Sequence, residues 1–327
     1  MAGAPDEFGL IAKYFAPLAA GFPGALGLTD DAAFLPPDAG HDTVVTVDAI
    51  VAGVHFLPDD PPGLVARKLV RVNLSDLAAK GAVPFAVLLS AAFPHGTGDD
   101  WLRAFADGLA EDLKEYGAAL IGGDTVSTPG PLTLSLTALG KVEAGRGLKR
   151  SGACVGDVVW VSGTIGDGAL GLLTATGKLA PDAHLLDRYR LPQPRVGLGP
   201  RLIGMASAAM DVSDGLVQDL GHMMRASGVK GDLTAWTVPL SQSAEAALAR
   251  DHSLLATVLT GGDDYELLFT APLEAGGAVS ALSAEVGVAL TPIGRVVAGQ
   301  GVAIRDARGR ALTLKHGGWR HFTGEAG

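Results

Sequence analysis

Cysteine is almost absent from this sequence: Cys154 is the single cysteine among 327 residues. One thiol forms neither an intramolecular disulfide nor a multi-cysteine zinc site, so both are excluded. Charged residues are also scarce, at 18%, and acidic residues outnumber basic ones 35 to 25, which gives a net charge of −10. Non-specific nucleic-acid binding needs a cationic face, so we expect no nucleic-acid partner.

Long uncharged runs are missing as well. The longest, residues 81–98, is interrupted by Pro84, Pro94 and several glycines, so it predicts a buried strand region rather than a membrane span. Near the start, Asp6 and Glu7 stand where a signal peptide would carry Lys or Arg. We therefore expect a soluble cytoplasmic protein with no membrane partner. The length predicts about two domains, and 48% apolar residues provide a sizeable core.

Glycine and aspartate are the residues in excess. The chain has 46 glycines, about twice the usual share, and its acids divide into 26 Asp and 9 Glu. Asp prefers caps and turns to helix interiors, so many of these side chains should lie at strand ends, turns and helix starts. Loops that hold phosphates and metals have this composition, and so do ordinary turns.

The apolar spacing predicts a mixed α/β order. The expected helices cover about 7–20, 64–81, 99–116 (capped by Asp99 or Asp100), 168–176, 195–209 and 214–227. The expected strands cover about 43–48, 85–93, 120–122, 132–142, 158–162, 208–213, 231–235, 266–270, 291–297 and 302–305. The apolar pattern stops over 143–157, where glycine and charge concentrate. We therefore place a domain boundary there, between residues 1–148 and 149–327.

Two familiar phosphate motifs do not fit well. Gly166–Gly171 matches G-x-G-x-x-G after an expected strand, but it lies mid-chain and no acid-ended strand clearly follows, so a dinucleotide site is disfavoured. Gly171–Lys178 has five residues between its glycines, and Leu179 stands where a P-loop needs Ser or Thr. The P-loop interpretation is rejected.

Aspartates at the ends of apolar runs are the main functional signal. They are Asp30, Asp31, Asp48, Asp76, Asp124, Asp211, Asp214, Asp263 and Asp264. Singly, Asp76 and Asp214 could be helix N-caps, Asp124 an Asx-turn, and Asp30 simply exposed. Together they favour one cleft, where neighbouring carboxylates need cations to stay ionised. Oxygen ligands suit Mg²⁺, so a magnesium-bound polyphosphate is the expected partner.

Other residues leave alternatives open. The pairs Gly122-Gly123 and Gly261-Gly262 each precede an Asp and allow the backbone to approach an anion. Lys149 and Arg150 fit a phosphate contact or a solvated turn, and His55 fits the core or a ligand contact. No G-x-S-x-G elbow is present, so covalent acyl chemistry is not expected.

With these residues in place, the chain resembles the thiamine-monophosphate kinase family, in the superfamily of aminoimidazole-ribonucleotide synthetase and selenophosphate synthetase. The resemblance spans nearly the whole chain and is carried by DEFGLIAKYF, TDDAA, TVDAIVAGVHF, VNLSDLAAKGA, LIGGDT, GRGLKRSGA, VSGTIGDGALGL, DVSDGLVQDLGH, GGDDYELLFT and GGWRHF. It implies a two-domain α/β (α+β) synthetase-like fold. The N-terminal mixed sheet would pair across a homodimer, and a C-terminal α/β sandwich domain would close the active-site cleft. It also implies ATP, several Mg²⁺ ions and direct phosphoryl transfer to thiamine monophosphate, giving thiamine diphosphate and ADP.

The resemblance also assigns roles to individual residues. The implied metal ligands are Asp30, Thr46, Val47 (through its carbonyl), Asp48, Asp76, Asp124, Asp211 and Asp214. The implied ATP contacts are Gly123, Asp124, Arg150 and Ser213, and the implied substrate contacts are His55, Asp263 and Trp319. Thr29 departs from the usual Gly, and Asp263 from the usual Glu. No covalent or general-base residue is expected, because a substrate phosphate is already an ionised nucleophile.

Three other functions can be set against this one. A metal-dependent phosphohydrolase would use similar carboxylates but would release phosphate without an acceptor. A sister synthetase would also cleave ATP, although selenide chemistry relies on an N-terminal Cys or selenocysteine and this chain has only Cys154. A non-catalytic nucleotide sensor would not need so many metal ligands.

Overall fold

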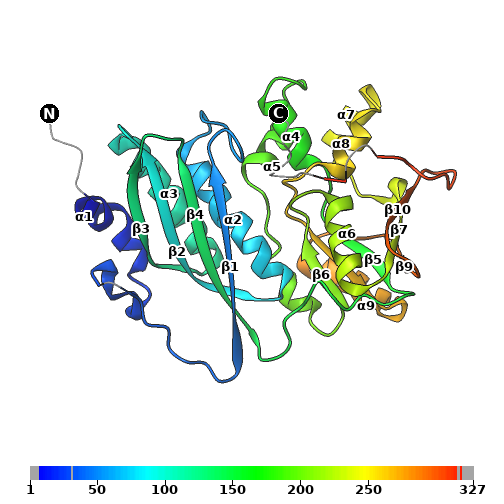
Figure 1. The fold of residues 1–327 in the computed structure, drawn as a ribbon, viewed down its shortest axis with the longest axis horizontal. Coiled ribbons are helices and arrows are strands. Elements are labelled where there is room, and N and C mark those ends of the chain that lie inside the picture. The colour runs from blue at the N-terminus through cyan, green and yellow to red at the C-terminus, as the bar shows by residue number, and fades with distance from the viewer. Residues whose placement is uncertain (1–6, 31, 315–316, 319–327) are drawn as a thin grey trace. The chain divides into compact units, whose positions relative to one another are not determined.

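The computed structural model in Figure 1 describes residues 7–30, 32–314 and 317–318. The chain divides into two units. Unit 1 is Met1–Leu77 with Ala82–Arg146, and unit 2 is Ala78–Gly81 with Gly147–Gly327. Within the described residues, no helix is long and apolar enough to cross a membrane.

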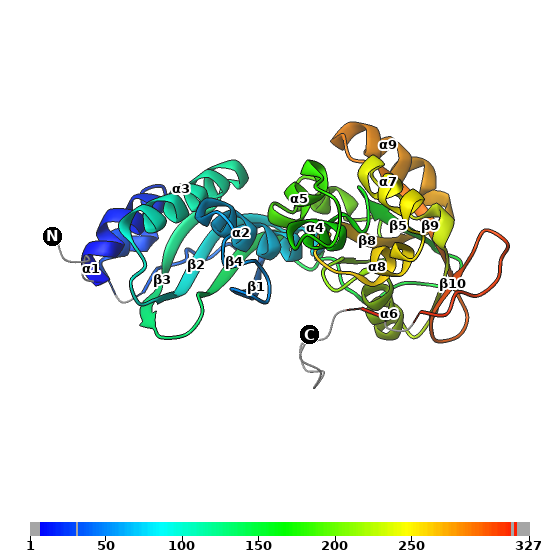
Figure 2. The same cartoon turned by 90° about the horizontal axis from the view of Figure 1, so that it is seen from above.

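Unit 1 is built on a four-stranded mixed sheet in the order β1-β4-β2-β3, in which only the β2–β3 pair is parallel. Its strands are β1 (His41–Val51), β2 (Val83–Pro94), β3 (Ala119–Thr128) and β4 (Thr133–Glu143). Its long helices are α2 (Pro62–Ala79) and α3 (Asp99–Tyr116), and Figure 2 shows both on one face of the sheet. The strands alternate buried and open positions, as a sheet covered differently on its two faces requires.

The N-terminal segment packs on the opposite face of this sheet. The helix expected over 7–20 is present only as three short pieces: α1 (Glu7–Leu10), a π-helical turn (Ile11–Phe15) and a 3₁₀ turn (Ala16–Ala19). Pro17 has no N–H, so it starts a new turn rather than continuing the α-helix. A second 3₁₀ turn follows at Pro23–Leu28. Ala19 and Ala25 from these turns pack on Ala86, Ile121 and Leu139 of the sheet.

Helix α3 has the expected bounds, but its expected cap is wrong. Gly98 occupies the N-cap position and no side chain caps the helix. The Asp99 carboxylate instead accepts hydrogen bonds from Lys13, Tyr14 and Arg103, so it ties the N-terminal segment to α3.

Unit 2 contains a six-stranded sheet in the order β10-β7-β9-β5-β8-β6. The strands are β5 (Val158–Ser162), β6 (Ala208–Asp211), β7 (Lys230–Thr234), β8 (Leu267–Ala271), β9 (Leu290–Val297) and β10 (Gly301–Arg305). The helices are α4 (Asp167–Ala175), α5 (Ala183–Arg190), α6 (Leu216–Ser227), α7 (Gln242–Arg250), α8 (Leu254–Thr260) and α9 (Gly276–Val286). On one face, Val159 and Val161 of β5 pack with α4, α6 and α8; on the other, Val158 and Trp160 pack with α9. The expected mixed α/β class with a C-terminal sandwich is confirmed.

The helix expected over 195–209 is wrong. Only a 3₁₀ turn at Gly199–Leu202 forms there, before β6 begins at Ala208. Pro200 lacks a backbone donor, and Gly204 takes a left-handed φ of 85°, so neither residue continues a helix. Helices α5, α7, α8 and α9 were not expected from the apolar spacing.

Candidate functional site

A cavity of about 940 Å³ in unit 1 contains three of the expected site residues. Asp30, Gly123 and Asp124 line it, between the N-terminal segment and the open face of the sheet. Asp124 lies inside β3 rather than at its end, so the Asx-turn interpretation is wrong. A Cβ at Gly123 would lie 1.9 Å from the carbonyl oxygen of Leu89, so only glycine allows β2 and β3 to pair here.

A second group of expected ligands lies between β1 and α2. The Thr46 hydroxyl donates to Asp76 Oδ2 at 2.5 Å, and the backbone N–H of Asp48 donates to Asn73 Oδ1 at 2.9 Å. Asp76 lies within α2, near its C-terminal end, so it is not a helix N-cap. Carboxylates and a hydroxyl converge here, which is a donor set suited to a hard cation.

These two groups occupy opposite faces of the sheet. Asp48 pairs with Leu136 on β4, whereas the next residue along, Thr137, lines the cavity. Side chains alternate along a strand, so Asp48 points toward α2 and Asp124 toward the cavity. Unit 1 therefore presents its expected metal ligands as two sets of oxygen donors rather than one.

His55 lies in the turn that follows β1 and is half-buried. Its Nδ1 accepts the backbone N–H of Val51 at 3.1 Å, which assigns the ring proton of the neutral form to Nε2. The buried Lys68 donates to the carbonyl oxygen of His55 at 3.0 Å. The imidazole is thus held in a fixed orientation by its neighbours, as a binding residue requires.

In unit 2, three expected residues lie between β6 and α6. Asp211 ends β6, and Ser213 and Asp214 follow in the turn before the helix. The N-cap interpretation of Asp214 is wrong, because Gly215 occupies the N-cap position of α6 and no side chain caps the helix. Asp219 Oδ2 accepts the N–H groups of Ser213, Asp214 and Gly215 at 3.0, 3.0 and 3.1 Å, which holds the turn before the helix.

Negative charge accumulates in this turn. Ligand atoms of Asp214, Asp219 and His222 lie within 4.8 Å of one another. Burial, followed by the charges of Asp211 and Asp214, raises the pKa of Asp219 to about 8. Burial and the cations Arg225 and Arg150 lower the pKa of His222, which places Arg150 near the same cluster. A cation bound here would relieve the repulsion.

Sequence reasoning missed Asp219 and His222. Their spacing of three residues places both on one face of α6, one turn beyond Asp214. That periodicity after the MDVSDGL motif is the signal that could have identified them.

Asp263 lies beside Ser213. Its N–H donates to the Ser213 carbonyl at 2.9 Å, and its backbone has a left-handed φ of 71°. Asp adopts this conformation more readily than Glu, so the departure from the family's Glu suits the local backbone. Thr29, the other departure, has a φ of −112° and needs no glycine. Trp319 lies outside the described residues.

The glycine-rich loop at Gly166–Gly171 binds a carboxylate of the chain itself. The buried Asp264 carboxylate accepts the N–H groups of Gly166 at 2.8 Å and Gly168 at 3.1 Å. Burial raises the pKa of Asp264, although these two N–H donors oppose the shift. The preceding strand, β5, is antiparallel to both of its neighbours, so the parallel dinucleotide-binding unit is absent here.

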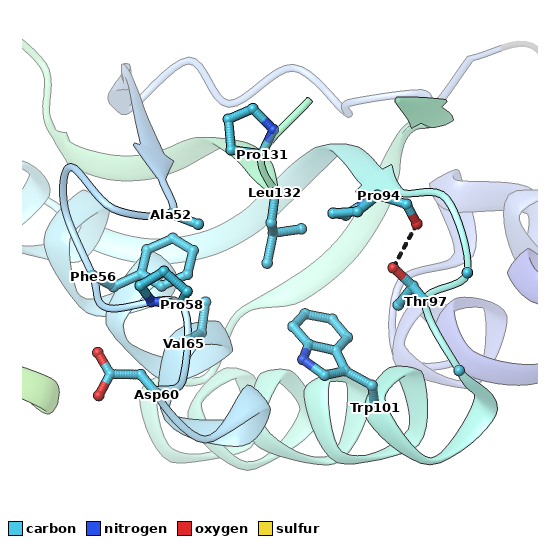
Figure 3. A pocket seen from close by; sticks show the side chains of 12 residues that line it. Ala52, Phe56, Pro58, Asp60, Val65, Pro94, Thr97, Trp101, Pro131 and Leu132 are labelled. Atoms are coloured by element: carbon cyan, nitrogen blue, oxygen red, sulfur yellow. Dashed lines mark hydrogen bonds between the residues drawn. The ribbon is translucent and has the colours of Figure 1, made fainter. Parts of the chain in front are cut away.

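A further cavity in unit 1, of about 460 Å³, is shown in Figure 3. Phe56, Trp101 and Leu132 face it, and Asp60 is the single carboxylate in its lining. Asp60 Oδ2 already accepts the N–H of Leu57 at 2.8 Å. None of the expected site residues that the structure describes lines this cavity, and its apolar walls do not suit a polyphosphate.

Comparison with known families and proteins covers both units. Residues 29–142 match the family model "AIR synthase related protein, N-terminal domain", and residues 155–307 match the corresponding C-terminal domain. The thiamine-monophosphate kinase of Caulobacter vibrioides is 44% identical, over 98% of this chain and 92% of its own. That of Salmonella typhimurium is 41% identical, over 97% of this chain and 98% of its own.

Solved structures agree with these relatives. The thiamine-monophosphate kinase of Stenotrophomonas maltophilia is 42% identical with a TM-score of 0.80, covering 87% of this chain and 91% of that one. The complex of AaThiL with AMPPCP and TMP is 30% identical with a TM-score of 0.78, covering 97% of each chain. The chain therefore belongs to the thiamine-monophosphate kinase family.

Proposed function

We propose that this protein transfers the γ-phosphoryl group of ATP to thiamine monophosphate. A phosphate oxygen of thiamine monophosphate bonds to the γ-phosphorus while the bond from that phosphorus to ADP breaks, which gives thiamine diphosphate and ADP. The observation that carries the proposal is the likeness to AaThiL, whose complex holds an ATP analogue and TMP and which aligns with 97% of this chain. Neither a sister synthetase nor a phosphohydrolase has comparable support.

Gly123, Asp124, Arg150 and Ser213 are the proposed nucleotide contacts. In unit 1, Gly123 and Asp124 line the 940 Å³ cavity, and Gly123 contributes only backbone atoms to that lining. In unit 2, Ser213 lies in the turn held by Asp219, and the cationic Arg150 acts on His222 of the cluster that contains Asp219. A flexible basic side chain beside a rigid polar turn suits a phosphate group.

Magnesium is the proposed metal, and the donor sets of both units fit it. In unit 1, Asp30, Thr46, the Val47 carbonyl, Asp48, Asp76 and Asp124 would hold more than one ion, because they form two sets of donors. In unit 2, Asp211 and Asp214 would also hold Mg²⁺; burial, followed by the charges of these two carboxylates, raises the pKa of Asp219 beside them. Bound Mg²⁺ would neutralise phosphate charge as the two anions approach.

The chain's own residues would mainly position the substrates. A substrate phosphate is already ionised, so no general base is needed. His55, with its ring orientation fixed, and Asp263, fixed beside Ser213, would contact thiamine monophosphate. Trp319 is proposed as a third contact. Correct placement alone supplies a large part of the acceleration in such reactions.

We also propose a cytoplasmic homodimer that associates through the sheet of unit 1. Strand β1 is an edge of that sheet, and its Val45 and Val47 are each 60% exposed. An unpaired edge with exposed valines is a surface that association would cover. The exposed free thiol of Cys154 is compatible with a reducing compartment.

A coupled ADP-release assay tests the function. Parallel reactions contain thiamine monophosphate, thiamine or no acceptor, each with Mg²⁺ or with excess chelator. We expect ADP only with thiamine monophosphate and Mg²⁺, together with stoichiometric thiamine diphosphate. ADP formed equally without an acceptor would identify a phosphohydrolase, and undiminished transfer in chelator would reject the metal proposal.

A further inference from the structure

The segment from Gly261 to Glu266, called here the 261–266 loop, has a strained backbone. It joins α8 to β8, and within it Asp263 and Tyr265 take positive φ values of 71° and 52°. Side-chain-bearing residues keep such angles only where the surroundings enforce them, and strain of this kind concentrates at functional sites. The loop carries Asp263, the proposed substrate contact.

Backbone hydrogen bonds tie one side of the loop to the turn before α6. The N–H groups of Asp263 and Tyr265 donate to the carbonyls of Ser213 at 2.9 Å and Val212 at 2.8 Å. The N–H of Val212 donates back to the carbonyl of Glu266 at 2.8 Å. The proposed substrate contact and the proposed nucleotide contact Ser213 are therefore parts of one hydrogen-bonded layer.

Buried charges hold the other side of the loop. The Glu266 side chain is fully buried, and its carboxylate accepts from Arg188 at 2.9 Å and from Arg195 Nε at 2.6 Å. The same Arg188 Nη2 donates to the carbonyl of Asp264 at 3.3 Å. Ser162 Oγ donates to Glu266 at 2.6 Å and accepts the N–H of Leu267 at 2.8 Å. Arg188 thus donates hydrogen bonds to two parts of the loop, the Glu266 side chain and the Asp264 carbonyl.

Such a buried network of charges contributes little net stability to the folded state. Desolvating one carboxylate and two guanidinium groups costs about as much as their attraction returns, and apolar side chains would fill the same volume equally well. The network instead fixes the orientation of the groups it joins, because charge-assisted hydrogen bonds constrain angles that apolar contacts leave free.

We propose that Glu266, through Arg188 and Arg195, is a positioning residue for substrate binding: it keeps the 261–266 loop in the strained form that presents Asp263. This inference rests on the proposed function and adds residues that do not touch the substrate. The nucleotide side should be affected less, because Asp219 holds the Ser213–Gly215 turn independently.

The test is Glu266→Gln, which keeps the size of the side chain and removes its charge. We expect the KM for thiamine monophosphate to rise roughly tenfold, with the KM for ATP changed by less than about twofold. Glu285→Gln is the matched control, because Glu285 pairs with Arg201 at the exposed surface of the same unit. If Glu266→Gln does not fold, Arg188→Lys keeps the charge and loses the planar fork, and the same split is expected.

A double-mutant cycle separates positioning from general weakening. If Glu266 acts through Asp263, Glu266→Gln adds little to the KM for thiamine monophosphate once Asp263→Ala is present. Equal effects of Glu266→Gln in both backgrounds would overturn the proposal.

Hydrogen exchange provides a readout that does not depend on activity. Loss of the ion pairs of Glu266 with Arg188 and Arg195 should speed hydrogen exchange at the amides of residues 263 and 265, which are bonded to the 212–213 segment. The amides of strand β9 should stay protected. Unchanged protection at both amides would also overturn the proposal. A wild-type protein inactive toward thiamine monophosphate would instead overturn the proposed function, and the exchange experiment would still decide the positioning claim.

Discussion

The aspartates of this chain have different structural roles, which depend on the groups that donate hydrogen bonds to their carboxylates. Asp219 accepts three backbone N–H groups and closes a turn, Asp264 accepts two and closes a glycine loop, and Asp76 accepts a hydroxyl beside Asp48. The first two satisfy the protein's own donors. The expected metal ligands Asp76 and Asp214 also accept hydrogen bonds, but from the side chains of Thr46 and Gln218 rather than from the backbone.

Exchange of one ligand carboxylate for an amide separates the two roles. Asp48→Asn and Asp214→Asn should each lower kcat by roughly 10²–10³-fold with the fold intact, because each removes a carboxylate proposed to hold the Mg²⁺ that offsets phosphate repulsion. Steady-state rates at saturating ATP, with circular dichroism, measure this.

The matched control is Asp182→Asn. Asp182 caps α5 by accepting the N–H of Leu185 at 3.0 Å, and Asn caps a helix nearly as well, so activity should be unchanged. If the Asp48 and Asp214 variants behave like this control, they are structural residues and not ligands.

At the scale of elements, the turn before α6 links stability to pH. Burial and two neighbouring carboxylates raise the folded-state pKa of Asp219 to about 8, whereas the unfolded chain ionises near the ordinary value of 3.8. The folded state therefore binds the extra proton between these limits. Stability from this group is complete below the unfolded pKa and is lost as pH rises toward 8, by at most about 1.4 kcal/mol per pH unit.

Asp219→Asn tests this linkage, since its amide oxygen can still accept the same three N–H groups. In chelator, the Tm of the wild type should fall from pH 5 to pH 8, and the variant should show a flatter profile with a higher Tm at pH 8. Added Mg²⁺ should raise the wild-type Tm at pH 8 more than that of the variant. Parallel profiles for the two proteins would show that Asp219 does not titrate in this range.

The sequence predicted elements best where one periodicity continues without interruption. Helix α3 and strand β5 were placed at their observed bounds, because the apolar residues of α3 follow one helical spacing and β5 is a continuous apolar run. The helix at 195–209 failed because apolar spacing outweighed Pro200 and Gly204, which stop a helix locally.

The site residues were predicted from short motifs rather than from periodicity. Asp48 and Asp214 were predicted as ligands because short motifs surround them, and these roles stay predictions. Glu266 and its arginines could not be predicted in this way, since Arg188 and Arg195 meet Glu266 only after β8 and α5 have packed.

At the scale of the whole molecule, the proposed dimer has a specific test. In a symmetric interface each substitution acts twice, so Val45→Glu should bring two charges into an apolar contact. We expect light scattering after gel filtration to report two chains for the wild type and one for the variant. Trp236→Ser, at the most exposed large apolar side chain described in unit 2 (83% exposed), should leave the mass unchanged. A wild type with the mass of one chain would reject the dimer.

The hydrogen-bonded network around Glu266 has a consequence for how the chain folds. Its hydrogen bonds join residues separated by 104, 78 and 71 positions along the chain, to Ser162, Arg188 and Arg195. Contacts of such long range form only after large loops have closed, so they belong to the late, slow part of folding. The strained loop at Asp263 then acquires its shape last, when β5, α5 and β8 are already in place. A nascent chain would then present Asp263, the proposed substrate contact, only when unit 2 is complete.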